Sequence, residues 1–152
     1  YAGSFDGTMY ALDSADGSVK WKLQTGDHIY ASPALVEKDG VLEQIIIGST
    51  DGLLYSVNPD GETLWTYDTG APIRSSPVVG QAPVEGGSPI VYVGAANGHV
   101  VAVNVNDGSR RWSSTPPRRS GRRVSTSAAR TEWCGSCPTT TAYVRGSPTP
   151  AA

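Results

Sequence analysis

The residues of this chain best suited to chemistry are two cysteines and two histidines. Cys134 and Cys137 have the spacing of one half of a zinc site, because thiolates two residues apart often bind zinc together. His28 and His99 would have to supply the other half, yet they lie far apart and form no histidine-pair motif. The sequence therefore disfavours a zinc site, and we predict no metal ligands.

Aspartates are the other candidates for catalysis or ion binding, but six of them lie at turn positions: Asp6, Asp13, Asp16, Asp51, Asp60 and Asp107. At such positions the carboxylate usually accepts hydrogen bonds from backbone amides of the turn. The segment 13–17 also lacks the ligand series and the final glutamate of a calcium-binding loop. The sequence contains neither a phosphate-binding loop nor a nucleophile elbow. We therefore predict no catalytic residues, no cofactor-binding residues and no cofactor.

Many of these residues belong to a pattern that occurs three times along the chain. The glycines that begin the three copies lie 45 and 46 residues apart. Each copy continues with an Asp-Gly or Asn-Gly pair, a second glycine turn and a tryptophan, which is Trp21, Trp65 or Trp112. A period of about 40–50 residues is typical of propeller blades, which bury their apolar faces only by packing on their neighbours.

Each copy predicts four short strands. The first is rich in β-branched and aromatic residues, as at 45–47 and 90–93. Hairpins with type I′ turns are predicted next, because Asp-Gly and Asn-Gly tolerate a positive φ at both central residues. These turns are expected at 6–7, 51–52 and 97–98, and the second strands at 8–12, 53–57 and 99–103. The tryptophan lies in the third strand, and a fourth strand is predicted to begin at 31–35 and at 75–79.

The predicted fold is all-β, a partial β-propeller of four-stranded antiparallel blades with an irregular C-terminal tail. We expect two nearly whole blades and half of a third, with repeats at about 1–44, 45–89 and 90–112 and a tail at 113–152. The 18 glycines and 11 prolines suit short strands joined by tight turns. Because Tyr1-Ala2-Gly3 aligns within a strand, we expect the chain to be part of a longer propeller. No apolar run approaches the ~20 residues of a membrane-spanning helix.

The motif Ala11-Leu12-Asp13-x-x-Asp16-Gly17-x-x-x-Trp21, together with Gly3-Ser4-x-Asp6-Gly7 before it and Ser32-Pro33 after it, resembles the pyrroloquinoline-quinone (PQQ)-like β-propeller repeat. The resemblance covers residues 1–112. It implies that the tryptophan of each blade docks on the backbone of the neighbouring blade. An indole buries roughly 150–250 Å², which gives this role a physical basis.

The PQQ-dependent dehydrogenases of this family hold the quinone and Ca²⁺ above a catalytic aspartate, and adjacent cysteines in a disulfide are their hallmark. Residues 1–112 contain no cysteine, so this feature is missing here. We therefore interpret the chain as a non-catalytic protein-binding or scaffold module of the bacterial cell envelope, like the relatives that assist outer-membrane β-barrel assembly. A fragment of a PQQ-dependent alcohol or sugar dehydrogenase is the alternative. The resemblance also implies a periplasmic or cell-surface location and protein partners bound through loops or blade edges, besides further blades of the same propeller.

The charge of the chain changes abruptly after Trp112. Residues 1–112 carry 6 basic and 13 acidic residues, whereas 113–152 carry 6 arginines and Glu132 alone. Three interpretations of this tail are open: a disordered linker, a basic arm for nucleic acid or anionic surfaces, and a fourth repeat translated in a shifted frame. We favour the shifted frame over a functional arm and predict no nucleic-acid partner. In that case the arginines and the two cysteines have no function of their own.

Overall fold

The computed structural model describes residues 1–81 and 87–115, which all belong to one compact unit, Tyr1–Arg118. These residues form eleven strands and no helix. The strands are β1 (Ala2–Gly3), β2 (Thr8–Leu12), β3 (Val19–Gln24), β4 (Ala34–Lys38), β5 (Val41–Gly48), β6 (Leu53–Val57), β7 (Thr63–Asp68), β8 (Val78–Gly80), β9 (Ile90–Gly94), β10 (Val100–Asn104) and β11 (Arg110–Ser114). Within the described part of the chain, nothing resembles a helix long and apolar enough to cross a bilayer. Most of the tail, with Cys134, Cys137 and the arginine pairs, lies outside the described residues.

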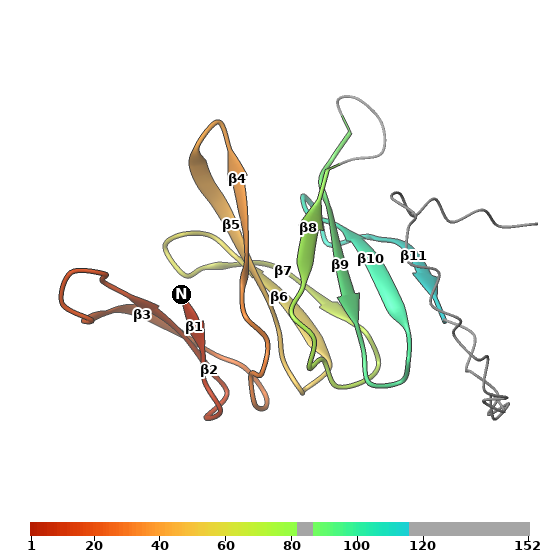
Figure 1. The fold of residues 1–152 in the computed structure, drawn as a ribbon, viewed down its shortest axis with the longest axis horizontal. Coiled ribbons are helices and arrows are strands. Elements are labelled where there is room, and N and C mark those ends of the chain that lie inside the picture. Colours follow the sequence, from red (N-terminus) through yellow and green to blue (C-terminus); the bar gives the residue numbers. More distant parts are fainter. Residues whose placement is uncertain (82–86, 116–152) are drawn as a thin grey trace, which may run out of the picture. The chain divides into compact units, whose positions relative to one another are not determined.

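The strands form three antiparallel sheets, as the all-β prediction requires. The first sheet has the order β1-β2-β3, the second β4-β5-β6-β7 and the third β8-β9-β10-β11. Figure 1 shows them in chain order, with the β4–β7 sheet between the other two. Each sheet is a simple antiparallel meander, because strands that follow one another in sequence pair side by side.

The sheets are offset from the sequence repeats by one strand. The fourth strand predicted in the first repeat is β4, and it pairs with β5 of the next sheet, with Leu35 opposite Ile45. In the same way β8 pairs with β9, so the incomplete sheet is the first one and not the last. The strands are grouped as three, four and four, with the shorter sheet first, because a period fixes the spacing of strands but not the sheet that each strand joins. Strands β4 and β8 each begin just after a proline, which has no N–H to donate to the hydrogen bonds between strands.

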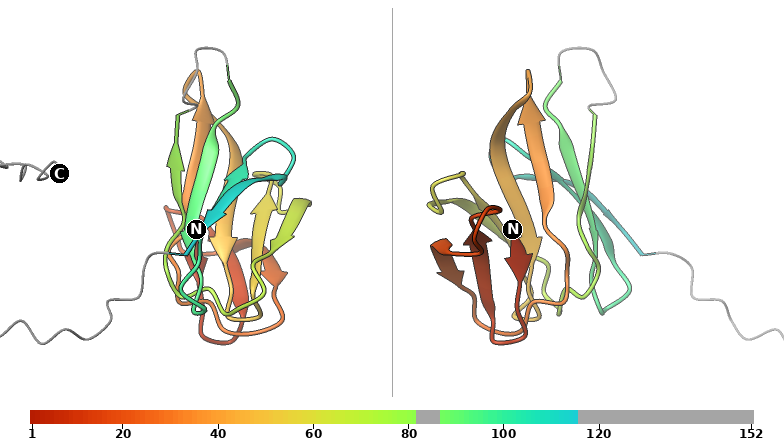
Figure 2. Two further views of the ribbon diagram at one scale, coloured as in Figure 1. Left: turned by 90° about the vertical axis from the view of Figure 1, so that its right-hand side faces the viewer. Right: turned by 60° about the vertical axis from the view of Figure 1, so that its left-hand side comes forward.

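A two-residue turn explains why β4 joins the second sheet. Asp39 and Gly40 have φ values of 52° and 77°, and the flanking residues Lys38 and Val41 are paired. Positive φ at both central residues is what a type I′ hairpin requires. This Asp-Gly turn connects β4 directly to β5, and Figures 1 and 2 place its tip at the end opposite the β1–β2 turn.

The type I′ turns predicted at 6–7, 51–52 and 97–98 are not found. At the first of these sites only Gly7 has a positive φ, of 82°, and its N–H donates to Ser4 O at 3.2 Å. This is the pattern of a longer hairpin loop that ends in a left-handed glycine. Asp6 keeps a negative φ because its carboxylate accepts the N–H of Thr8 at 2.8 Å, which closes the turn from the side chain.

Two apolar cores lie between the sheets. Met9, Ile45, Ile47 and Val57 form the core between the first and second sheets, together with Ile29 of the connecting segment. The core between the second and third sheets is larger and contains these buried residues: Val36, Ile46, Leu54, Ile73, Val91, Val93, Val101, Val103 and Val105. Neighbouring residues of β5 serve different cores because successive side chains of a strand point to opposite faces. The middle sheet is therefore covered on both faces.

Trp21 joins the first sheet to the second, as the family resemblance implied. Its indole N–H donates to Pro59 O at 2.7 Å. The ring lies so close to Gly61 that a Cβ there would stand 2.7 Å from Trp21 Cδ2. Gly61 also has a φ of 91°, so both the backbone conformation and the approach of the indole require glycine.

Trp65 makes the same contact one sheet further on. Its indole N–H donates to Val105 O at 2.7 Å, and a Cβ on Gly108 would stand 2.8 Å from Trp65 Cδ2. Trp112, the third tryptophan of the pattern, has no such neighbour among the described residues and is 44% exposed. Its strand β11 continues to Ser114, so regular structure extends two residues past the predicted boundary at 112.

Candidate functional site

Five of the six turn aspartates make the backbone contacts predicted for them. Each accepts a hydrogen bond from the N–H two residues further on, at 2.8–2.9 Å; they are Asp6, Asp13, Asp16, Asp51 and Asp107. A carboxylate that accepts such bonds is stabilised in its charged form. The pKa of Asp6 is accordingly lowered to about 2, first by the N–H of Thr8 and then by the hydroxyl of Tyr10. The carboxylates of these five residues are therefore engaged in turn structure.

Asp51 has an additional role between two sheets. Its Oδ2 accepts the N–H of Gly26 at 2.8 Å and the hydroxyl of Tyr55 at 2.6 Å. Burial, followed by this bond to Asp51, raises the pKa of Tyr55 to about 12. Because Gly26 follows the first sheet and Asp51 lies in the second, the carboxylate ties the sheets together at the end where the β5–β6 turn lies.

The two histidines lie in different surroundings. His99 donates its backbone N–H to Asn97 Oδ1 at 3.0 Å, and its ring lies 3.3 Å from Thr115 Oγ1. His28 is half-buried and stacks on Phe5, with ring centroids 4.2 Å apart. Among residues 1–81 and 87–115, no group of three or more His, Cys, Asp or Glu side chains is placed to hold a metal ion. Cys134 and Cys137 lie outside the described residues, so the zinc question for them stays a prediction.

An aromatic surface, formed by Phe5, His28, Tyr30 and Arg74, is the most distinctive group of exposed side chains in the described residues. Tyr30 meets Phe5 edge to face at 5.0 Å, and the guanidinium of Arg74 lies 5.8 Å from the centre of the Tyr30 ring. Phe5 is 59% exposed and Tyr30 51% exposed. Ring pairs of this geometry and a cation over a ring attract each other, so the group is ordered although it faces solvent.

Backbone contacts hold the aromatic surface in place. The segment that carries His28 and Tyr30 is tied to the β1–β2 turn by the bond from Ile29 N to Ser4 O at 3.1 Å. Thr25 Oγ1 fastens the start of this segment by donating at 2.7 Å to a backbone oxygen. Ser32 N donates to Ser76 Oγ at 2.9 Å, which links the segments that precede β4 and β8. The rings are therefore carried by anchored loops.

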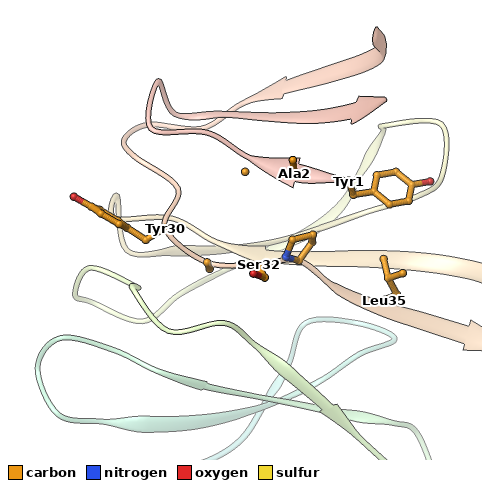
Figure 3. A pocket seen from close by; sticks show the side chains of 8 residues that line it. Tyr1, Ala2, Tyr30, Ser32 and Leu35 are labelled. Carbon is orange, nitrogen blue, oxygen red and sulfur yellow. The ribbon is translucent and has the colours of Figure 1, made fainter. Parts of the chain in front are cut away.

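A pocket of about 460 Å³ adjoins the aromatic surface. It is lined by β1 and the residue before it, and by the segment that leads into β4 and the start of that strand: Tyr1, Ala2, Gly3, Tyr30, Ala31, Ser32, Pro33 and Leu35. Figure 3 shows Tyr30 at one end of this pocket and Tyr1 with Leu35 at the other. The pocket therefore connects the exposed ring of Tyr30 to the start of β4.

Sequence reasoning missed the aromatic surface. His28 was considered only as a possible zinc ligand, and Phe5 and Tyr30 were given no role. A comparison between the repeats could have revealed this surface. The second copy has Thr50, Pro72 and Arg74 at the positions of Phe5, His28 and Tyr30, so the aromatic residues are particular to the first copy. Equivalent bonds, from Ile29 N to Ser4 O and from Ile73 N to Ser49 O, confirm this correspondence.

Known proteins resemble this chain in sequence and in fold. BamB, the outer membrane protein assembly factor, from Shewanella oneidensis is 32% identical over 113 residues, which are 74% of this chain and 27% of the relative. The crystal structure of BamB from Moraxella catarrhalis superposes with a TM-score of 0.57 at 23% identity, over 74% of this chain and 31% of that one. A europium-containing methanol dehydrogenase gives the same TM-score at 20% identity, over 70% of this chain and 21% of that one. The same fold therefore occurs in BamB and in a dehydrogenase.

A family profile adds a longer match to these pairwise similarities. The profile described as outer membrane protein assembly factor BamB matches residues 1–133, which include all three sheets and all the docking contacts above. The chain spans about a quarter of the length of the curated relative, so it carries only part of what that protein contains. On the profile match and the three propeller-like sheets, the chain belongs to the BamB family of PQQ-like β-propeller repeat proteins.

Proposed function

We propose that this chain is a protein-binding module of the bacterial cell envelope that takes part in outer-membrane protein assembly and performs no chemistry of its own. We further propose that it acts in the periplasm or at the cell surface and binds its partner through the aromatic surface. The observation that carries this proposal is the ordered, exposed group of Phe5, His28, Tyr30 and Arg74.

The composition of this surface supports protein binding. Aromatic residues and arginine are enriched at protein interfaces and dominate their binding energy. Rings that already stack on one another lose little conformational freedom when a partner covers them. Phe5 and Tyr30 expose more than half of their area, which is far more than an isolated packing role needs.

The restriction of these rings to one repeat also supports a function in binding. Residues needed by every blade recur in every copy, as the docking tryptophans do. The rings of the aromatic surface instead lie at positions where the first copy differs from the second. The remaining member, Arg74, belongs to the second repeat, where it occupies the position that corresponds to Tyr30. Folding alone does not require aromatic residues at these positions, since the second copy folds in the same way without them.

Site-specific crosslinking tests this proposal. The chain would be exported to the periplasm of Shewanella oneidensis with a photoreactive phenylalanine analogue at position 5. We expect a crosslink to a component of the outer-membrane protein assembly machinery. The control carries the analogue at Val41, which is 65% exposed and lies at the tip of the β4–β5 hairpin, at the opposite end of the sheets. Val41 should give no such crosslink.

Two results would contradict the proposal. Equal crosslinking from positions 5 and 41 would mean that the aromatic surface is not the contact. Reduction of an electron-accepting dye after addition of PQQ and Ca²⁺ to the purified chain would instead favour the dehydrogenase alternative.

A further inference from the structure

Arg74 is an exposed cation that lies over an aromatic ring and not beside a carboxylate. Its guanidinium is 5.8 Å from the centre of the Tyr30 ring. Within residues 1–81 and 87–115, ion pairs are formed by Lys20 and His28 but not by Arg74. The charge of Arg74 is therefore not used by an ion pair in the described part of the chain.

The sequence around Arg74 makes its lack of a carboxylate partner informative. Residues 39–109 contain Arg74 as their only arginine or lysine. The same segment contains these acidic residues: Asp39, Glu43, Asp51, Asp60, Glu62, Asp68, Glu85 and Asp107. Carboxylates are thus abundant, yet none of those in the described residues pairs with Arg74. Pairing among the described residues does not account for this arginine.

The contact with Tyr30 suits the binding of an anion by Arg74. A guanidinium is planar, and its face is the part that packs on an aromatic ring. Its N–H groups point outward in the plane, where a carboxylate can accept two of them in parallel. The cation and the ring therefore present hydrogen-bond donors for a planar anion beside an apolar surface.

Anchored neighbours hold the backbone of Arg74 in place. On one side Ile73 is fully buried, and its N–H donates to Ser49 O at 3.0 Å. On the other side Ser75 Oγ donates to Gly94 O at 2.9 Å and accepts the N–H of Gly94 at 3.0 Å. Only the side chain of Arg74 is left to adjust when a ligand binds.

Tyr30 is fixed to the segment that carries Arg74. Its neighbour Ile29 is buried, and Ser32 N donates to Ser76 Oγ at 2.9 Å. Because Ser76 lies two residues after Arg74, this bond helps to set the spacing between the ring and the cation. Tyr30 lies between the first and second sheets and Arg74 between the second and third, so each has a described sheet on both sides.

The surroundings of Arg74 favour a carboxylate over a phosphate. A phosphate group carries up to two negative charges and is typically bound by a cluster of arginines. Here the other basic side chain of the aromatic surface, His28, already lies 3.6 Å from the carboxylate of Asp27. The exposed rings of Phe5 and Tyr30 add apolar area. The site therefore suits a single carboxylate with an aromatic side chain next to it.

We propose that Arg74 binds an aspartate or glutamate side chain of the partner polypeptide, and that a neighbouring aromatic side chain of that polypeptide packs on Phe5 and Tyr30. This inference rests on the proposed function, because it assigns the kind of sequence that the aromatic surface selects. The guanidinium donates two N–H bonds to the carboxylate while its face stays on Tyr30. Exchange of the carboxylate for an amide removes the ionic contact and leaves the apolar one.

Two peptides that differ in one group provide the test. They are acetyl-Gly-Phe-Asp-Phe-Gly-amide and the same peptide with Asn in place of Asp, and NMR titration of the full chain measures their binding through the Arg74 Nε–H signal and the amides of 29–31 and 73–75. The unchanged chain should bind the Asp peptide about three- to fivefold more tightly, as expected for an exposed ion pair. Arg74→Gln should bind both peptides alike.

Matched controls separate this site from general attraction of charge. Arg110→Gln removes the same charge from an exposed residue of β11 and should keep the full preference for the Asp peptide. A third peptide, with Gly in place of both Phe residues, should bind more weakly than the Asp peptide, because it cannot pack on Phe5 and Tyr30.

Several results would overturn the carboxylate site. They are equal binding of the Asp and Asn peptides by the unchanged chain, no binding of either at the solubility limit, a preference that persists in Arg74→Gln or disappears in Arg110→Gln, and undiminished binding of the glycine peptide. The peptides contain no component of the assembly machinery, so this test is separate from the crosslink at position 5. A missing crosslink with an intact preference for the Asp peptide would contradict the proposed function alone, and the reverse result would contradict the carboxylate site alone.

Discussion

Trp65 and Trp112 hold the same position in their repeats but face different surroundings. Trp65 is covered by the third sheet and bonds to Val105 O, whereas Trp112 is 44% exposed. The local sequence provides the same indole at both places. The comparison teaches that a repeat residue stabilises the fold only when the next blade supplies a carbonyl and a glycine surface.

Truncation of the two tryptophans should give the largest difference. Trp65→Ala removes a ring that packs on the core between the second and third sheets, and we expect a loss of about 2–4 kcal/mol in the free energy of unfolding. Trp112→Ala should cost less than about 1 kcal/mol in a single chain, because solvent already covers much of the ring. Urea denaturation at a concentration where sedimentation gives single chains measures both values. Equal losses of unfolding free energy in the two variants would contradict the difference between Trp65 and Trp112.

Substitution of the facing glycines tests the acceptor side. Asparagine tolerates positive φ at both Gly108 and Gly17, but at Gly108 its Cβ would stand 2.8 Å from Trp65 Cδ2. We therefore expect Gly108→Asn to lower the free energy of unfolding by about 1–3 kcal/mol more than Gly17→Asn does. The same urea experiment gives this difference, and an absent or reversed difference would contradict the docking geometry.

Removal of the indole N–H alone isolates the hydrogen bond. Trp65→Phe keeps an aromatic ring but leaves the carbonyl of the buried residue Val105 without its donor, which should cost about 1–3 kcal/mol including the smaller ring. Trp112→Phe serves as the matched control and should be nearly neutral in a single chain. If the two substitutions have the same effect on urea denaturation, the bond to Val105 O does not stabilise the fold.

The hydroxyl of Tyr55 should give a smaller, pH-dependent effect. Its pKa is raised to about 12 in the folded chain, so the neutral hydroxyl stabilises the fold below the ordinary tyrosine pKa of about 10. This contribution should be lost as the pH rises from about 10 to 12. The difference in absorbance at 295 nm between the unchanged chain and Tyr55→Phe, followed against pH, reports the titration. A midpoint near 10 would show that Asp51 and burial do not hold the proton.

Asp6, in the β1–β2 turn, should give the smallest effect. Its pKa is lowered to about 2 by Thr8 N–H and the Tyr10 hydroxyl, so the charged carboxylate stabilises the turn above the ordinary aspartate pKa of about 4. The contribution should be lost as the pH falls from about 4 to 2. The ¹³C shift of the Asp6 carboxyl in an NMR titration measures this, with Tyr10→Phe expected to raise the midpoint. A midpoint near 4 would mean that the turn bonds are not formed.

Much of the architecture could be predicted from the residues themselves. The strand limits 8–12 and 53–57 are confirmed, since the glycine turns on either side of them fix where pairing begins and ends. The docking of Trp21 and Trp65 on a neighbouring backbone is also confirmed. The assignment of 34–38 to a sheet could have been made too, because Asp39-Gly40 between two apolar runs is a strong hairpin signal.

The aromatic surface could not be predicted from the local sequence around its residues. Phe5 and Tyr30 lie 25 residues apart, and neither has a neighbour in sequence that indicates a shared surface. Their rings meet because Ile29 N bonds to Ser4 O, a contact that exists only once the first sheet has formed. The same holds for Arg74, which reaches Tyr30 from the segment between the second and third sheets.

The amino-acid sequence determined the period, the strands and the residues that dock one blade on the next, because these depend on spacing and on local backbone preferences. The tertiary structure decided which sheet takes each fourth strand, which side chains gather into the aromatic surface and which docking residues are covered within the described part of the chain. Those outcomes depend on which segments become neighbours in space, and equal repeats can have unequal neighbours.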